Sequence, residues 1–162
     1  QPSMQRWVPL DQAAIAGTAR TRNPLNHPSV ILRRSAVLAV GNYRSVPGFE
    51  DYDLWLRMLR VYGSKALANT SKPLVLVRVG HAHIARRHGW RYAMAEASFF
   101  SSCWHNRLLP WWCVFAAFAF RFPLRLLPMG LLAWFMRSCT RQSLASVPSR
   151  RVKSKGARAA QH

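Results

Sequence analysis

The sequence predicts an α/β fold that is followed, toward the carboxyl end, by amphipathic helices. Two observations lead to this prediction. Between residues 23 and 80, short β-rich runs alternate with helical runs, which is typical of α/β domains. Between residues 108 and 137, the chain is almost wholly apolar, but prolines and arginines interrupt it too often for a membrane-spanning helix.

The same observations divide the chain into four parts. We expect residues 1–22 to be the end of a preceding α/β half and residues 23–84 to be the α/β segment itself. Residues 85–137 are expected to form amphipathic, membrane-associated helices, and residues 138–162 a basic, disordered tail. The first residue is Gln1 and no signal-peptide pattern is present, so we expect a processed or truncated piece of a longer chain.

Composition limits the classes of protein that remain. Half of the 162 residues are hydrophobic and 12% are aromatic, which excludes a wholly disordered chain. A formal net charge of +19 predicts an anionic partner, which can be nucleic acid, anionic lipid or a phosphorylated small molecule. The three cysteines form neither a disulfide framework nor a zinc pattern, so we expect reduced thiols in a cytosolic setting.

Three helices are predicted in the first part of the chain. Residues 10–22 have Asp11 near their start and arginines near their end, which agrees with the helix dipole. "SAVLAVGNY", residues 35–43, predicts one short helix with Ser35 as its cap and Gly41 as its stop. "YDLWLRMLRVYG", residues 52–63, predicts an amphipathic helix of about three turns.

Two strands are predicted beside these helices. "NPLNHP", residues 23–28, has the composition of a turn, and "SVILR", residues 29–33, follows it as a short, buried strand. The second strand is predicted over "SKPLVLVRVG", residues 71–80.

The aromatic, basic segment after Gly80 predicts helices of another kind. A spanning helix needs about 20 uninterrupted apolar residues. Here the longest stretch without charge or proline, from Trp111 to Phe120, is half that length. We therefore expect broken amphipathic helices in the membrane interface, with Trp and Phe at headgroup depth. Packing of residues 108–137 against the protein's own core is the alternative.

Three of the five acidic residues lie together in "VPGFEDYDLWLR", residues 46–57. Glu50 and Asp51 fall at the start of the predicted amphipathic helix, and Asp53 lies just inside it. Carboxylates at this position can cap the helix. A carboxylate at the rim of a cleft can also take a proton from an attacking sugar hydroxyl. Both interpretations fit the residues.

Residues 23–80 resemble the second half of a family 2 glycosyltransferase catalytic domain of the bacterial exopolysaccharide, amylovoran type. That family shows an N-P-(hydrophobic)-N-H-P turn, a hydrophobic strand, a short S-A-V-L helix and a G-Y-R turn. The motif F-E-D-Y-(D/E)-L-W-L-R and a P-L-V-x-x-R-x-G strand follow, and this sequence matches them almost without a gap. The resemblance implies the acceptor-side, C-terminal half of a GT-A, Rossmann-like domain. It also implies sugar transfer from a nucleotide-sugar with inversion, with a divalent metal, Mn²⁺ or Mg²⁺.

The resemblance implies roles for individual residues. Asp51 would be the catalytic base, and Glu50 would help to orient the acceptor. Asn26 and His27 would line the cleft near the donor phosphates, and Arg78 would bind phosphate or face water. We expect Trp55 and Arg57 to be structural and to hold their helix against the sheet.

The sequence departs from the family in one respect. We identify no nucleotide-binding strand near the amino end and no D-x-D metal motif, so we expect the main metal ligands outside this segment. His81 and His83 lie two apart, but no carboxylate or cysteine accompanies them, and we expect no metal site there. Transfer activity of the isolated segment is not expected.

The predicted partners are a nucleotide-sugar donor, a lipid-linked glycan acceptor and an anionic membrane surface, without nucleic acid. The predicted location is the cytoplasmic face of the bacterial inner membrane, during exopolysaccharide or O-antigen assembly. Two alternatives remain open. One is a noncatalytic, membrane-associated remnant. The other is a basic nucleic-acid-binding protein, although no helix-turn-helix, zinc-finger or RNA-binding signature is present.

Overall fold

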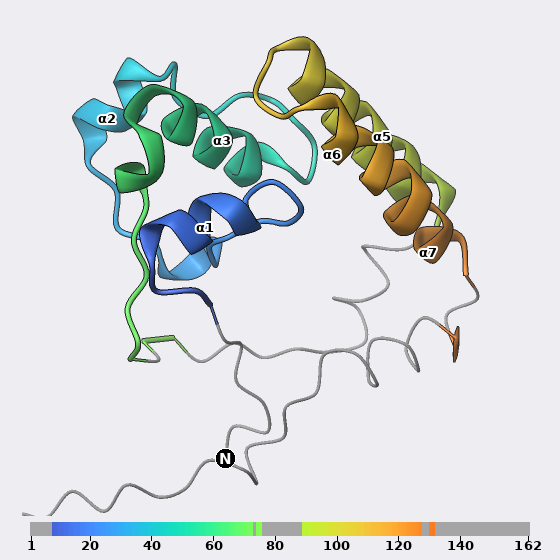
Figure 1. Cartoon of the computed structure of the whole chain (residues 1–162), viewed down its shortest axis with the longest axis horizontal. Helices are drawn as coiled ribbons and strands as arrows, with labels where there is room; N and C mark the ends of the chain where they lie inside the picture. The colour runs from blue at the N-terminus through green and yellow to red at the C-terminus, as the bar shows by residue number, and fades with distance from the viewer. Residues whose placement is uncertain (1–7, 73, 76–88, 128–129, 132–162) are drawn as a thin grey trace, which may run out of the picture.

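The computed structural model describes residues 8–72, 74–75, 89–127 and 130–131, and these form helices and loops (Figure 1). No β-strand occurs among them. The elements in chain order are α1 (Gln12–Thr18), the 3₁₀ turn η1 (His27–Ser29), α2 (Arg34–Ala39), α3 (Glu50–Tyr62), the 3₁₀ turn η2 (Gly63–Ala66), α5 (Trp90–His105), α6 (Trp111–Ala116), the π-helical turn η3 (Ala117–Arg121) and α7 (Phe122–Leu126).

Helix α3 lies between two groups of helices (Figure 1). Seven consecutive residues, from Tyr52 to Met58, are buried because neighbours pack against opposite sides of the helix. Leu54 and Trp55 face α1 and α2, whereas Leu56 faces α5 and α6. A helix that is buried on most of its circumference is a core helix, so the acidic residues lie at the start of a core helix.

The first group confirms two predicted helices. Asp11 caps α1, and its side chain accepts a hydrogen bond from the backbone N–H of Ala14 at 2.8 Å. Helix α2 begins at Arg34, so Ser35 is not its cap, and the chain turns back at Gly41 with a φ of +86°. This φ is left-handed, which explains why glycine stands at that position.

The second group is a helical hairpin that packs on α3. Helices α6 and α7 return along α5, and the backbone N–H of Gly89 before α5 donates to the carbonyl of Arg125 in α7 at 3.0 Å. Phe49 stacks on Phe99 with ring centroids 4.7 Å apart, and Phe100 is fully buried beside them. The amphipathic helix predicted from residue 52 is thereby joined to the carboxyl-terminal helices.

The predicted strand over residues 29–33 is wrong. Ser29 ends η1, and the chain then runs to Arg33 without a strand, with Ile31 98% exposed. An extended segment becomes a strand only when a neighbour pairs with its backbone, and no described residue does so here. The second predicted strand, over residues 71–80, lies largely outside the described residues, as do Arg78, His81, His83 and the tail from residue 138.

The prediction that prolines and charges break the apolar segment is confirmed at Pro110 and wrong at Arg121 and Pro123. Pro110 precedes α6, but residues 111–126 are helical without a gap. The π turn η3 joins α6 to α7, and Pro123 lies in the first turn of α7. Within the described ranges, no helix combines the length and the apolar character needed to cross a bilayer.

Candidate functional site

The Asp51 carboxylate lies in the first turn of α3, beside the turn that begins at Asn23. The Asn23 amide donates from Nδ2 to Asp51 Oδ2 at 2.7 Å, and the backbone N–H of Tyr52 donates to Oδ1 at 2.7 Å. Asn23 is itself fixed, because its Oδ1 accepts from the backbone N–H of Leu25 at 3.2 Å. Each carboxylate oxygen thus has one donor and retains accepting capacity for a ligand.

The capping interpretation needs correction. The N-cap of α3 is Phe49, which makes no side-chain capping bond, and Glu50 is exposed as the first helical residue. Asp51 accepts from the residue that directly follows it, not from a third-position amide as an N-cap would. Both carboxylates still meet the positive end of the helix dipole.

The third acidic residue, Asp53, has a structural role. It is buried, and its Oδ2 accepts from Nε of Arg57 at 2.8 Å. Asp51 and Asp53 do have the D-x-D spacing, so the expectation that the sequence lacks this spacing is wrong. Asp53 is instead paired with Arg57 inside the fold. The described part of the chain contains no group of three or more His, Cys, Asp or Glu residues placed to hold a metal.

Arg57 also holds the turn between α2 and α3. Its guanidinium donates from Nη1 to the carbonyl of Val40 and from Nη2 to the carbonyl of Asn42, the latter at 2.7 Å. Asn42 has a φ of +56°, an uncommon backbone conformation that these bonds help to maintain. Arg57 is structural, as predicted, and binds the backbone that follows α2, whereas Trp55 is fully buried against α1 and α2. The described residues contain no sheet on which either could pack.

The turn places Tyr43 near the carboxylate. Its ring meets the His27 ring edge-to-face at 5.8 Å, and the centroid of His27 is 6.5 Å from that of Trp55. Burial and, secondarily, the negative charge of Asp51 raise the pKa of the Tyr43 phenol. The side chain remains 40% exposed, so an aromatic ring borders the site on its solvent side.

The predicted site residues are therefore only partly brought together. Tyr43 links His27 and Asp51, because its ring meets that of His27, and burial together with the charge of Asp51 raises the pKa of its phenol. Asn26 is the N-cap of η1, next to His27. Glu50 is on the exposed start of α3. Sequence reasoning missed Asn23 and Tyr43, although the first residue of "NPLNHP" and the tyrosine of "GNYR" were present in the motifs that carried the resemblance.

Comparison with known proteins gives the family context for this geometry. An amylovoran biosynthesis glycosyltransferase, AmsE, of Erwinia amylovora is 34% identical over 93 residues, which cover 57% of this chain and 34% of that protein. An uncharacterized glycosyltransferase of Haemophilus influenzae is 35% identical over 127 residues, which cover 78% of this chain and 46% of that protein. The chain resembles part of a glycosyltransferase.

A third glycosyltransferase relative comes from Escherichia coli. It is named UDP-Gal:alpha-D-GlcNAc-diphosphoundecaprenol beta-1,3-galactosyltransferase and is 35% identical over 78 residues, 48% of this chain and 28% of that protein. The chain thus spans less than half the length of these relatives. No family model and no solved structure matches the chain.

Proposed function

We propose that this chain is the acceptor-side part of an inverting, family 2 glycosyltransferase with a GT-A catalytic domain. The enzyme transfers a sugar from a nucleotide-sugar to a lipid-linked glycan in exopolysaccharide or O-antigen synthesis. The observation that supports this function best is the Asp51 carboxylate, held by Asn23 at the start of a buried helix, inside the segment that resembles glycosyltransferases.

Asp51 is the proposed catalytic base. In a single displacement, the acceptor hydroxyl attacks the anomeric carbon while a base removes its proton, and the nucleoside diphosphate leaves. The two N–H donors on Asp51 fix its orientation, and the remaining lone pairs accept the proton. A base attached to a rigid helix keeps the geometry that this step requires.

The surrounding residues are assigned to the two substrates. Exposed Glu50 orients the acceptor, and the Tyr43 ring offers an apolar face beside Asp51 on which an acceptor sugar can stack. Asn26 and His27 contribute to the donor side near the phosphates, together with Arg78. We assign the Mn²⁺ or Mg²⁺ ion and most of the donor contacts to the part of the enzyme that the relatives contain outside the matched residues. That ion would neutralise the leaving diphosphate.

The test is Asp51→Asn in the full-length gene product. Turnover is measured with labelled UDP-sugars and a synthetic N-acetylglucosamine-diphospho-lipid acceptor, the acceptor type named for the Escherichia coli relative. Loss of the base is expected to lower kcat by about 10²–10⁴-fold. Asp11→Asn is the matched control, because asparagine caps a helix as well as aspartate does and α1 lies away from the carboxylate. Unchanged turnover of Asp51→Asn would refute the assignment.

An anionic membrane is the second proposed partner. One face of α6 and η3 packs on α5 through Cys113 and Ala117, whereas the opposite face exposes Trp111, Phe115 and Phe120 by 66%, 67% and 72%. Such a face, on a chain with a net charge of +19, fits an interface of anionic lipid better than nucleic acid. We propose binding at the cytoplasmic face of the inner membrane, where the lipid-linked acceptor would be held.

A further inference from the structure

We propose that Arg121 is a positioning residue for the carboxylate of Asp51, an inference that rests on the proposed function. From the π turn η3, Arg121 holds the loop formed by residues 19–23. The last residue of that loop, Asn23, orients Asp51. The carboxyl-terminal hairpin would then contribute to the geometry of a base that lies on a different part of the fold.

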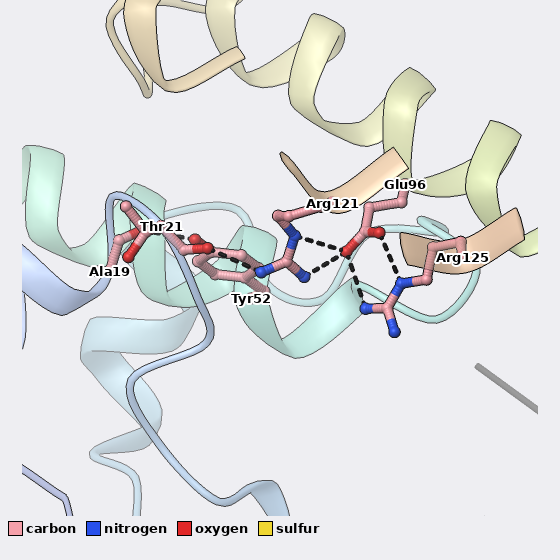
Figure 2. A network of polar contacts seen from close by, with 6 residues as sticks. All are labelled: Ala19, Thr21, Tyr52, Glu96, Arg121 and Arg125. Atoms are coloured by element: carbon pink, nitrogen blue, oxygen red, sulfur yellow. Dashed lines mark hydrogen bonds and ion pairs between the residues drawn. The ribbon is translucent and has the colours of Figure 1, made fainter. Parts of the chain in front are cut away.

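The starting point is a carboxylate clamp inside the hairpin (Figure 2). Glu96 of α5 is 3% exposed, and two guanidiniums bind it. Arg121 donates from Nε to Oε1 at 3.0 Å and from Nη2 to the same oxygen. Arg125 donates from Nε to Oε2 at 2.9 Å and from Nη2 to Oε1 at 3.3 Å.

The clamp fixes Arg121 in one orientation. Burial by itself raises the pKa of Glu96, but the hydrogen bonds and charges of Arg125 and Arg121 outweigh burial and lower that pKa overall. Glu96 is therefore a charged anchor at neutral pH. Arg121 also lies over the ring of Phe100, with its guanidinium carbon 5.6 Å from the centroid. A guanidinium with these contacts on two sides has little rotational freedom.

The remaining nitrogen of Arg121 reaches across to the first group of helices. Nη1 donates to the carbonyl of Thr21 at 2.9 Å, and Figure 2 shows this bond on the side of the guanidinium away from Arg125. Nearby, the hydroxyl of Tyr52 donates to the carbonyl of Ala19 at 2.7 Å. Two carbonyls of the loop are thus bound by side chains of other elements. Tyr52 of α3 binds one, and Arg121 of η3 binds the other.

The loop is also tied to the end of α1, because the backbone N–H groups of residues 20–22 donate to the carbonyls of Gly17 and Thr18 at 3.0–3.1 Å. Its side chains add little packing. Ala19 is buried, but the next three residues, Arg20, Thr21 and Arg22, are exposed. Asn23 lies two residues beyond the carbonyl that Arg121 binds, and its amide donates to Asp51. A displacement of 1 Å at a reacting group can cost about 10²-fold in rate, so a small shift of this loop is sufficient to matter.

Arg125 provides a matched comparison inside the same clamp. It binds Glu96 through two nitrogens and lies over the Tyr92 ring at 4.9 Å, but no described contact joins it to the loop. A merely structural role for the clamp predicts equal effects at Arg121 and Arg125. A positioning role predicts a catalytic effect at Arg121 alone.

The experiment measures kcat, acceptor KM and thermal stability of Arg121→Met and Arg125→Met in the full-length gene product, with the donor and acceptor named above. Arg121→Met is expected to lower kcat by about 10–100-fold while acceptor KM changes less, and Arg125→Met is expected to change kcat by less than about threefold. If both variants lose kcat equally at equal stability, the inference is overturned.

Arg121→Lys is the second variant, to be used if Arg121→Met does not fold. Lysine retains a charge for Glu96 but lacks the fork that binds Glu96 and Thr21 together, so the loss of kcat is expected to persist. Full rescue by lysine overturns the inference.

A double-mutant cycle tests the route through the loop. If Arg121 acts through Asn23, Arg121→Met combined with Asn23→Ala costs no more than Asn23→Ala alone, whereas additive losses contradict that route. Asp51→Asn in the same assay separates the two proposals. Retained turnover in that variant refutes the proposed function itself, and its loss leaves the Arg121 comparison to decide the further inference.

Discussion

Replacing Arg57 with methionine tests how the fold holds the turn that carries Tyr43. The guanidinium of Arg57 is buried with Asp53 and also donates to the carbonyls of Val40 and Asn42. Methionine fills a similar volume with none of these donors. Asp53, 6% exposed, then becomes a buried carboxylate without its cation.

The expected loss of stability follows from that unpaired charge. Removing one partner of a buried ion pair costs about 3–5 kcal/mol, because the remaining charge keeps its desolvation penalty. For a protein of this size, each kcal/mol lowers the melting temperature by about 2–4 °C, so a decrease of roughly 6–20 °C is expected. The carbonyls of Val40 and Asn42 lose their donor in this variant, and this loss lowers stability further only if water does not reach them.

The assay is chemical denaturation of the wild type, Arg57→Met, and Asp53→Leu combined with Arg57→Met. The double variant removes the stranded charge, so it is expected to recover most of the stability that the single variant loses. A loss below about 1 kcal/mol for Arg57→Met would refute the reasoning. A double variant less stable than the single one would refute it as well.

The remaining predictions concern acid stability and membrane binding. The pKa of Glu96 in the folded protein lies below its ordinary value of 4.5, so its stabilising contribution is complete above that pH and is lost as pH falls through the folded-state pKa. Thermal melts toward acid are expected to fall more steeply in the wild type than in Glu96→Gln, and parallel slopes would contradict this role. Replacing Trp111 and Phe115 with serine is expected to lower binding to phosphatidylglycerol vesicles several-fold in sedimentation. The control is Ile31→Ser, which alters an even more exposed apolar side chain away from the hairpin. Equal binding by all these variants would argue against the membrane-facing surface.

Local sequence predicted the helices correctly, but it wrongly predicted a strand over residues 29–33. Capping by Asp11 and the apolar periodicity from residue 52 depend only on residues a few positions away. Each predicted a helix that the structure contains. The run "SVILR" has β propensity, but a strand is a property of two paired segments, and the described residues offer no partner. Propensity alone therefore gave the wrong element there.

The site was predictable only where its chemistry is local. Asp51 was identified because the motif around it is contiguous in sequence. Asn23 is 28 positions from Asp51, and Arg121 is 100 positions from Thr21. No spacing rule connects such positions, because only tertiary packing brings them together: the loop after α1 lies against α3, and the hairpin reaches that loop through Arg121. The sequence did not predict that the helix continues through Arg121 and Pro123, nor that Arg121 binds Glu96.

The π turn η3 gives the hairpin an unusual sensitivity to chain length. A π turn accommodates one more residue per turn than an α-helix, and here it ends at Arg121. Phe120, immediately before it, remains exposed, whereas Arg121 turns inward to Glu96. Deleting one residue from the turn would rotate everything after it by about 100° and carry Arg121 away from both the carboxylate and the loop. Homologues of this segment should therefore vary in the identity of residues 117–120 more readily than in their number.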